Sequence, residues 1–194
     1  HNGFDSQWAS AWYLDGYSDN TAPVEPRGLR FADVRAGIHQ VPTGAQDFGW
    51  RGWNFLRAIN VGMDNYGKAV EKGVPQATVD KYIAEARLFR GWFYGDKVQK
   101  FGDVTWVEHE LTTESEELYA PRTPREEVME KVLADLNFAC EKLPSATKVE
   151  GDPGRFNRWI ALAVKARICL FEGTWRKYHG GTDPTKWLTE AANA

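Results

Sequence analysis

The chain has 194 residues, 42% of them hydrophobic and 26% charged, with 24 Lys and Arg against 27 Asp and Glu. This composition is typical of a folded globular chain and excludes disordered or collagen-like classes. The net charge of -3 leaves no basic footprint, so nucleic acid is not expected as a partner. The longest uncharged apolar run, near residues 159–164, is far shorter than the roughly 20 residues of a membrane helix. Nine Trp residues are unusual and direct attention to aromatic surfaces.

Residues 1–48 are predicted to form a loop-rich segment, because they lack a sustained hydrophobic period and contain repeated Pro and Gly. The remainder, residues 49–194, is predicted to be helical. Long irregular segments are uncommon in compact domains unless they are functional. This one is rich in aromatic residues, so we expect it to face a ligand.

Two helices are predicted after this segment, over about residues 50–70 and 79–97. In both, apolar residues recur at steps of three and four, the period of a helix with one buried face. Trp53 lies in the apolar stripe of the first and is expected in the core. Gly102 is expected to end the second.

Three more helices are predicted toward the C-terminus. Thr123, Pro124 and Glu126 have the spacing of an N-cap, a first helical Pro and a capping box, and Pro144 would end that helix. The next would begin at a cap on Asn157, end at Gly173 and bury a stripe of Ile160, Val164, Ile168 and Phe171. Another begins near Thr185. Only residues 103–108 favour an extended segment.

Several polar and sulfur-containing residues are expected to be structural. Cys140 and Cys169 are predicted to be buried free thiols, with a bridge between neighbouring helices as the alternative. Arg57, Arg87 and Arg167 lie beside apolar stripes and are expected to pair with carboxylates such as Glu85 or Asp135. His179 has no second His or Cys near it in the sequence, so a packed ring is favoured over a metal ligand or a general base.

These predictions give an all-α chain of helix hairpins following a loop-rich N-terminal segment. Residues 86–88 and 166–168, Ala-Arg-Leu and Ala-Arg-Ile, occupy similar places in the two hairpins and indicate a degenerate helix-pair repeat. Small residues in the second helix of each hairpin would let neighbouring helices approach closely: Ala84, Ala86, Ala161, Ala163 and Ala166.

Four segments, in order, match the motifs of one known family. Residues 53–60, Trp-Asn-Phe-Leu-Arg-Ala-Ile-Asn, are similar to an aromatic-x-x-Ile-Arg-x-x-Asn signature, with Leu in the Ile position. Residues 85–94 and 100–104 are similar to a Glu-Ala-Arg helix and a Phe-Gly-Asp-Val turn, although Thr105 replaces the usual Pro. Residues 122–144 and 154–179 are similar to the third and fourth helices of that family. Through these segments the chain resembles the SusD/RagB-like nutrient-binding lipoproteins of bacterial outer membranes.

The resemblance implies a tetratricopeptide-like helical scaffold and a surface that binds a glycan or a peptide. It also implies docking to a SusC-like TonB-dependent transporter, without a cofactor or an enzymatic reaction. Members are longer than this chain, which is therefore expected to be the N-terminal part of one larger SusD-like protein. That protein would lie at the bacterial cell surface, attached to the outer membrane only by an N-terminal lipid anchor absent from these residues.

The ligand is expected to be an oligosaccharide, because the flat C–H faces of a pyranose stack on aromatic rings while its hydroxyls need polar partners. The alternative is that the Trp and Tyr rings of residues 1–48 pack on the helices and that the acidic residues of this segment cap turns. The candidate ligand-binding residues supply aromatic rings and polar side chains: Trp8, Trp12, Tyr13, Tyr17, Asp19, Asn20 and Trp50.

Two other functions stay open from the sequence: a peptide-binding member of the same family, and a scaffold whose helices bind only the transporter. A glycoside hydrolase is a more distant possibility, because the separation of two carboxylates cannot be read from sequence. No zinc-protease helix, nucleophile elbow, phosphate loop, dinucleotide fingerprint or EF-hand spacing occurs in the chain.

Overall fold

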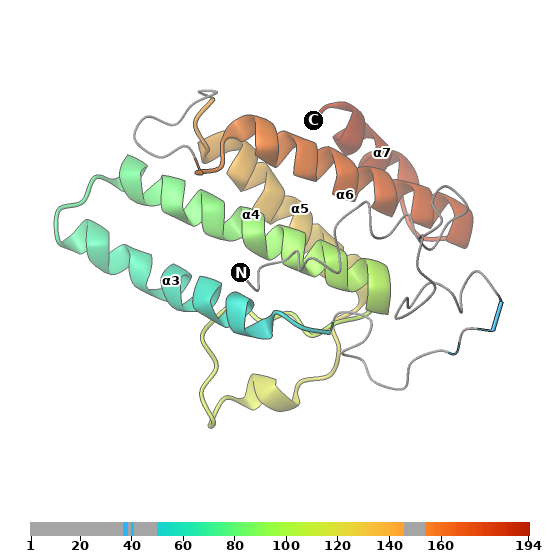
Figure 1. The fold of residues 1–194 in the computed structure, drawn as a ribbon, viewed down its shortest axis with the longest axis horizontal. Coiled ribbons are helices and arrows are strands. Elements are labelled where there is room, and N and C mark those ends of the chain that lie inside the picture. The colour runs from blue at the N-terminus through green and yellow to red at the C-terminus, as the bar shows by residue number, and fades with distance from the viewer. Residues whose placement is uncertain (1–36, 39, 41–49, 146–153) are drawn as a thin grey trace, which may run out of the picture. The chain divides into compact units, whose positions relative to one another are not determined.

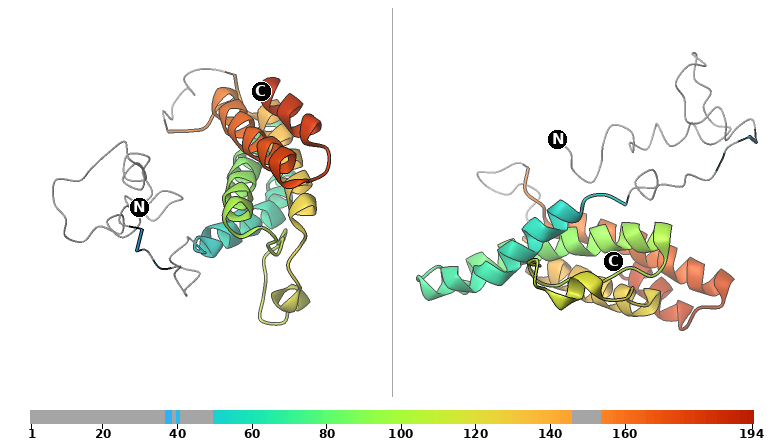
Figure 2. Two further views of the ribbon diagram at one scale, coloured as in Figure 1. Left: turned by 90° about the vertical axis from the view of Figure 1, so that its right-hand side faces the viewer. Right: turned by 90° about the horizontal axis from the view of Figure 1, so that it is seen from below.

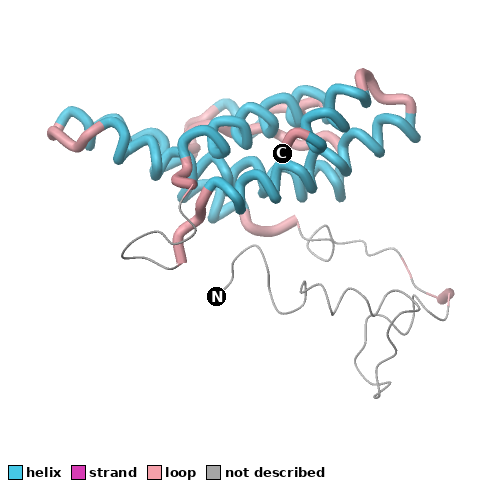
Figure 3. The backbone as a smooth tube through the Cα atoms, turned by 90° about the horizontal axis from the view of Figure 1, so that it is seen from above, coloured by secondary structure: helices cyan, strands magenta, loops and turns pink. Residues whose placement is uncertain are grey.

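The computed structural model describes residues 37, 38, 40, 50–145 and 154–194. Residues 53–194 form one compact unit, and its regular structure is helical (Figures 1 and 3). Within the described ranges the only β-pairing is a single bridge between Val104 and Thr123. The all-α prediction is confirmed. The elements are α3 (Trp53–Glu71), α4 (Gln76–Phe101), a 3-10 helix η3 (Glu116–Tyr119), α5 (Arg125–Lys142), α6 (Arg158–His179) and α7 (Pro184–Ala192).

Consecutive helices pack on one another, so that α3 contacts α4, α4 contacts α5, α5 contacts α6 and α6 contacts α7 (Figure 2). This arrangement of stacked hairpins is the tetratricopeptide-like architecture expected from the sequence. Glycine permits close approaches of α4 to its neighbours, since a Cβ atom at Gly91 would lie 3.2 Å from Leu136 and one at Gly95 would lie 3.0 Å from Ile168. No helix in the described part of the chain is long and apolar enough to cross a membrane.

Two predicted helix ends are confirmed. Gly102 follows α4 with φ of 68°, a left-handed conformation that favours glycine, and its N–H donates to the Val98 carbonyl. Asn157 caps α6, because its side-chain oxygen accepts a hydrogen bond of 3.0 Å from the N–H of Ile160. Both ends depend on residues within a few positions of the helix, which explains why the sequence predicts them.

The predicted capping box of α5 is wrong. The Thr123 hydroxyl accepts instead from the N–H of Trp106, and the Glu126 carboxylate accepts from the N–H of Thr182. The first N–H of α5, on Arg125, donates to the Asp103 carboxylate at 2.8 Å. Asp103, at the other end of the connection between α4 and α5, thus replaces the local acceptor Thr123. Tertiary structure supplies this acceptor, and sequence spacing does not reveal it.

The predicted end of the fourth helix at Gly173 is also wrong, because α6 continues to His179 and ends at Gly180, whose φ is 74°. Gly173 lies inside the helix, where α7 approaches closely. The predicted buried stripe is rotated as well: Ile168 is buried, but Ile160 is 37% exposed. The face of α6 that is buried carries mainly small and charged residues: Ala161, Lys165, Cys169, Glu172, Gly173 and Arg176.

Two glycine substitutions are expected to have opposite effects on stability. A Cβ atom at Gly173 would lie 2.8 Å from Cγ of Leu188 and 3.0 Å from its backbone nitrogen, so Gly173→Ala should lower the free energy of unfolding by about 1–3 kcal/mol. Gly67 in α3 has nothing within 4 Å, so Gly67→Ala should raise it by up to about 1 kcal/mol. Urea unfolding of both variants measures the difference, and equal signs would contradict the close α6–α7 approach.

Candidate functional site

Six of the seven predicted ligand-binding residues lie outside the described residues, and their role stays a prediction: Trp8, Trp12, Tyr13, Tyr17, Asp19 and Asn20. Trp50 is described; it is half-buried and precedes the first residue of α3. The division of the chain at residues 48 and 49 also stays a prediction. The structure therefore shows none of the predicted residues brought together into a site.

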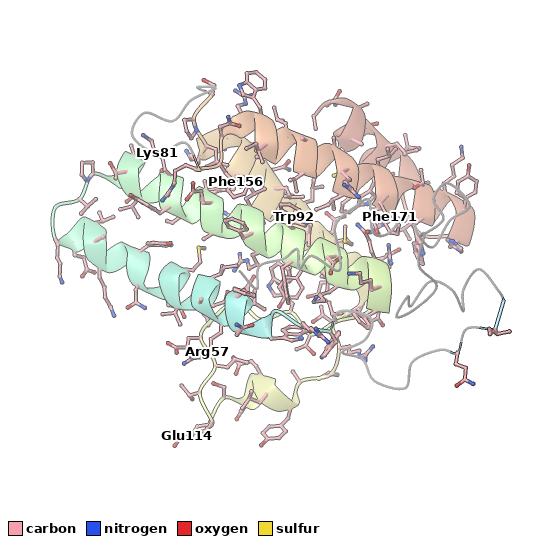
Figure 4. All side chains as sticks on the ribbon, viewed as in Figure 1. Arg57, Lys81, Trp92, Glu114, Phe156 and Phe171 are labelled. Atoms are coloured by element: carbon pink, nitrogen blue, oxygen red, sulfur yellow. The ribbon has the colours of Figure 1, made fainter. Side chains whose placement is uncertain are left out.

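An aromatic strip that the sequence analysis did not single out lies along α4. Tyr82, Phe89 and Trp92 follow one another at steps of seven and three residues and lie on one side of the helix; Tyr82 is 45% exposed and Trp92 39% exposed. Phe156, from the segment before α6, packs edge-on against Phe89 with ring centroids 4.9 Å apart. Figure 4 shows Trp92 and Phe156 on this side of the molecule. We call these four residues the α4 aromatic strip.

A charged pair lies beside one end of the α4 aromatic strip. Arg155 donates twice to the Glu85 carboxylate, with Nε 2.9 Å from one of its oxygens. The same guanidinium lies over the Tyr82 ring, 4.8 Å from its centroid. Rings next to a planar ion pair form an amphipathic surface, which can contact both the C–H faces and the hydroxyls of a sugar. The alternation of aromatic and charged residues on α4 was the available sequence signal for this surface.

A buried carboxylate joins α4 to α5. Asp135 is 1% exposed and accepts hydrogen bonds of 2.6 Å from Nε of Arg87 and 2.6 Å from Nε of Arg90. Burial alone would lower the pKa of Arg90, but the hydrogen bonds and charge of Asp135 outweigh it, and the pKa is raised. The predicted pairing of Arg87 with Asp135 is confirmed, and its role is structural.

A second buried carboxylate joins α5 to α6 and lies near α7. Glu172 is fully buried and accepts from Arg125 of α5 and from Arg176, whose Nε is 2.8 Å away. Each guanidinium also lies over a tryptophan ring, Arg125 over Trp175 at 3.7 Å from the centroid and Arg176 over Trp187 at 4.8 Å. These charges stabilise the helical stack, and nothing in the sequence pattern separated them from surface residues.

A polar stripe on α3 holds the connection between α4 and α5. Asn60 is fully buried, and its side-chain amide donates to the carbonyl oxygens of Val107 and His109 at 3.1 and 3.2 Å. Asp64 accepts from the N–H of Glu110 and contacts His109, while Arg57 pairs with Glu110. The Arg-x-x-Asn part of the family-like signature thus has a structural role, which is to fasten this connection to α3.

The His109–Asp64 pair predicts a measurable titration. The hydrogen bond and charge of Asp64 raise the pKa of His109, and the bonds from Glu110 and His109 lower that of Asp64. Protonated His109 stabilises the attachment of the α4–α5 connection to α3 at low pH, and this contribution is lost as the pH rises through the raised pKa of His109. Ionised Asp64 stabilises the same attachment at higher pH, and this contribution is lost as the pH falls through the lowered pKa of Asp64. The attachment should be strongest between about pH 3.9 and 6.5, the ordinary pKa values of Asp and His.

NMR titration of the His109 ring should therefore give a pKa above about 6.5 in the unmodified chain and a lower one in Asp64→Asn. Glu114→Gln serves as the control, because Asp64 and its hydrogen bonds are unaffected. A His109 pKa that does not respond to Asp64→Asn would contradict the pairing.

The remaining predicted structural residues have mixed outcomes. Cys140 and Cys169 are buried free thiols, as predicted, and burial raises the pKa of Cys169 to about 12. His179 is exposed and packs against the Trp175 ring at 5.1 Å between centroids. The expected ion pair of Arg167 is not found among the described residues, and this side chain is exposed on α6. Those residues also contain no group of three or more His, Cys, Asp or Glu that could hold a metal ion.

Comparison with known proteins identifies relatives for these helices. The chain is 30% identical over 109 residues to a SusD-like protein of Bacteroides ovatus, covering 56% of this chain and 19% of that protein. It is 30% identical over 99 residues to SusD-like protein P2 of Formosa agariphila, covering 51% of this chain and 19% of that protein. The chain thus spans about a fifth of the length of these relatives. No protein-family model matches the sequence.

Solved structures share the fold. A SusD-like protein from Bacteroides fragilis aligns with a TM-score of 0.56 and 22% identity, covering 76% of this chain and 26% of that one. Surface glycan-binding protein A from Bacteroides fluxus aligns with a TM-score of 0.59 and 19% identity, covering 78% of this chain and 31% of that one. These residues are thus similar in sequence to SusD-like proteins, and they share the helical fold of the solved SusD-like structure.

Proposed function

We propose that the chain is the N-terminal part of a cell-surface glycan-binding protein that passes oligosaccharides to a SusC-like TonB-dependent transporter. The observation that carries this proposal is the SusD-like sequence combined with the SusD-like fold, one structural relative of which is named a surface glycan-binding protein. In this proposal the protein is held at the outer membrane by a lipid anchor, binds its ligand without chemical conversion and needs no cofactor.

Binding would depend on aromatic stacking with orienting polar groups. Residues 1–48 would supply Trp8, Trp12 and Tyr17, together with the side chains of Asp19 and Asn20. The α4 aromatic strip offers a second surface of the same chemistry, with Trp92 39% exposed and the Glu85–Arg155 pair nearby. Stacked rings and planar hydrogen-bonding groups favour sugars over strongly charged ligands.

Calorimetry of the whole protein with oligosaccharide pools tests the proposal. We expect heat of binding with at least one glycan pool, and weaker binding in the triple variant Trp8→Ala, Trp12→Ala, Tyr17→Ala. Trp159→Ala, at a 54% exposed position on α6, is the control and should leave affinity unchanged. Absence of heat with every glycan pool would contradict the proposal.

A peptide pool added in competition separates the glycan from a peptide ligand. If the peptide pool displaces the glycan or binds alone, the ligand class is wrong although the family assignment stands. If cells that carry the triple variant take up the ligand normally, the aromatic residues of 1–48 do not bind the ligand.

A further inference from the structure

The connection between α4 and α5 is a loop whose two ends are joined by hydrogen bonds. Its ends meet where the N–H of Thr123 donates to the Val104 carbonyl at 3.1 Å and that of Arg125 donates to Asp103 at 2.8 Å. Its first half is fastened to α3 through Asn60 and Asp64, as described above. Compact loops with joined ends are often functional, because they present a surface segment in a fixed position.

Residues 111–121 form the tip of this loop, which extends away from the helices. Glu114 marks it in Figure 4. The tip has its own internal hydrogen bonds, including 2.9 Å from the N–H of Thr112 to the hydroxyl of Ser115. It nevertheless exposes two apolar side chains: Tyr119 is 88% exposed and Leu118 is 50% exposed. An ordered segment that exposes adjacent tyrosine and leucine has the chemistry of an interface anchor.

The charge of the loop is one-sided. Residues 104–121 contain five Glu and no Lys or Arg. Glu108 lies 3.6 Å from Lys131, and Glu110 pairs with Arg57, so these two are compensated by the helices. The other three, Glu114, Glu116 and Glu117, are exposed, have no ion-pair partner among the described residues and directly precede the apolar pair in the chain. Their negative field disfavours nucleic acid and anionic lipid as partners.

We propose that the loop tip, defined as Glu114, Glu116, Glu117, Leu118 and Tyr119, docks onto a protein surface that carries Lys or Arg around an apolar socket. Tyr119 and Leu118 would fill the socket, and the three carboxylates would orient the encounter and exclude anionic partners. A neutral sugar carries no positive charge that could compensate three carboxylates, so the charge pattern favours a protein over a glycan. This docking does not depend on the ligand class proposed above.

Site-specific photo-crosslinking in the native cell tests this docking. The photoreactive residue p-benzoylphenylalanine replaces Tyr119 in the whole protein, and in a matched control it replaces Tyr178, which is 75% exposed on α6. We expect one covalent protein product at position 119 and none at 178. Mass spectrometry should place the linked peptide next to Lys or Arg residues of the partner. Changing the three Glu to Gln, or raising the salt concentration, should reduce the yield.

With that partner purified, Tyr119→Ser should weaken binding about tenfold or more, and Tyr178→Ser should leave it unchanged. Circular dichroism and the unfolding midpoint should be unaltered in both, since neither side chain is buried. No product at 119, equal products at 119 and 178, a product with lipid or glycan, or a yield insensitive to the Glu→Gln changes would each overturn the proposal. None of these results bears on the calorimetry with glycans, so the two proposals fail separately.

Discussion

Replacing Asp135 with alanine is expected to lower the free energy of unfolding by about 3–5 kcal/mol. The side chain is 1% exposed and is the shared acceptor for Arg87 and Arg90. Its removal leaves Arg90, itself 7% exposed, as a buried guanidinium without the carboxylate that compensates it. An uncompensated buried charge is among the most destabilising changes that a single substitution makes. Urea unfolding monitored by circular dichroism measures the loss.

The control for Asp135→Ala is Glu130→Gln, which breaks an ion pair with Lys186 between two exposed helix surfaces. Exposed pairs contribute about 0–1 kcal/mol, so this variant should unfold almost as the unmodified chain does. If Asp135→Ala costs no more than Glu130→Gln, then Asp135 does not hold α4 against α5.

Replacing Trp187 with alanine is expected to have an effect of similar size, about 3–5 kcal/mol, through lost packing rather than lost charge. Trp187 is fully buried and is the one buried residue of α7. A helix of nine residues is too short to be stable alone, so α7 depends on this contact with α6. Hydrogen exchange should show faster exchange of the α7 amides, together with a lower urea midpoint for the whole unit.

Leu170→Ala is the matched control for Trp187→Ala, because it also removes a large apolar side chain but from a 53% exposed position on α6. Its effect should be within about 0.5 kcal/mol of zero. Faster α7 exchange in Leu170→Ala, or unchanged exchange in Trp187→Ala, would contradict the assignment of Trp187 as the α7 anchor.

The helices of the compact unit could be predicted because their signals are local. A three- and four-residue apolar period marks α3 and α4, and the Gly102 and Asn157 ends depend on residues within four positions. α7 begins at Pro184, next to the predicted start near Thr185. The family-like motifs in these same helices are consistent with the relatives that the chain proved to have.

The predictions that failed involve partners distant in the sequence. The capping box at Thr123 fails because the Asp103 carboxylate accepts the first N–H of α5, while the Thr123 hydroxyl accepts from Trp106. Gly173 was expected to end a helix, since glycine is common at helix ends, but here it accommodates the approach of Leu188. A glycine has the same sequence signature in both roles, and only the neighbouring helix distinguishes them.

By itself, the sequence determined the fold class, an all-α chain of stacked helix hairpins, and its resemblance to SusD-like motifs. The ligand candidates in residues 1–48 and at Trp50 stay a prediction. Tertiary structure decided which charges are buried and where the loop between α4 and α5 attaches. The pairs responsible, Arg90–Asp135, Arg125–Glu172 and Asn60–Val107, are separated by 45 to 47 residues. Hydrophobic periodicity specifies which face of a helix is apolar, but the partner of a buried charge is fixed only when the helices pack.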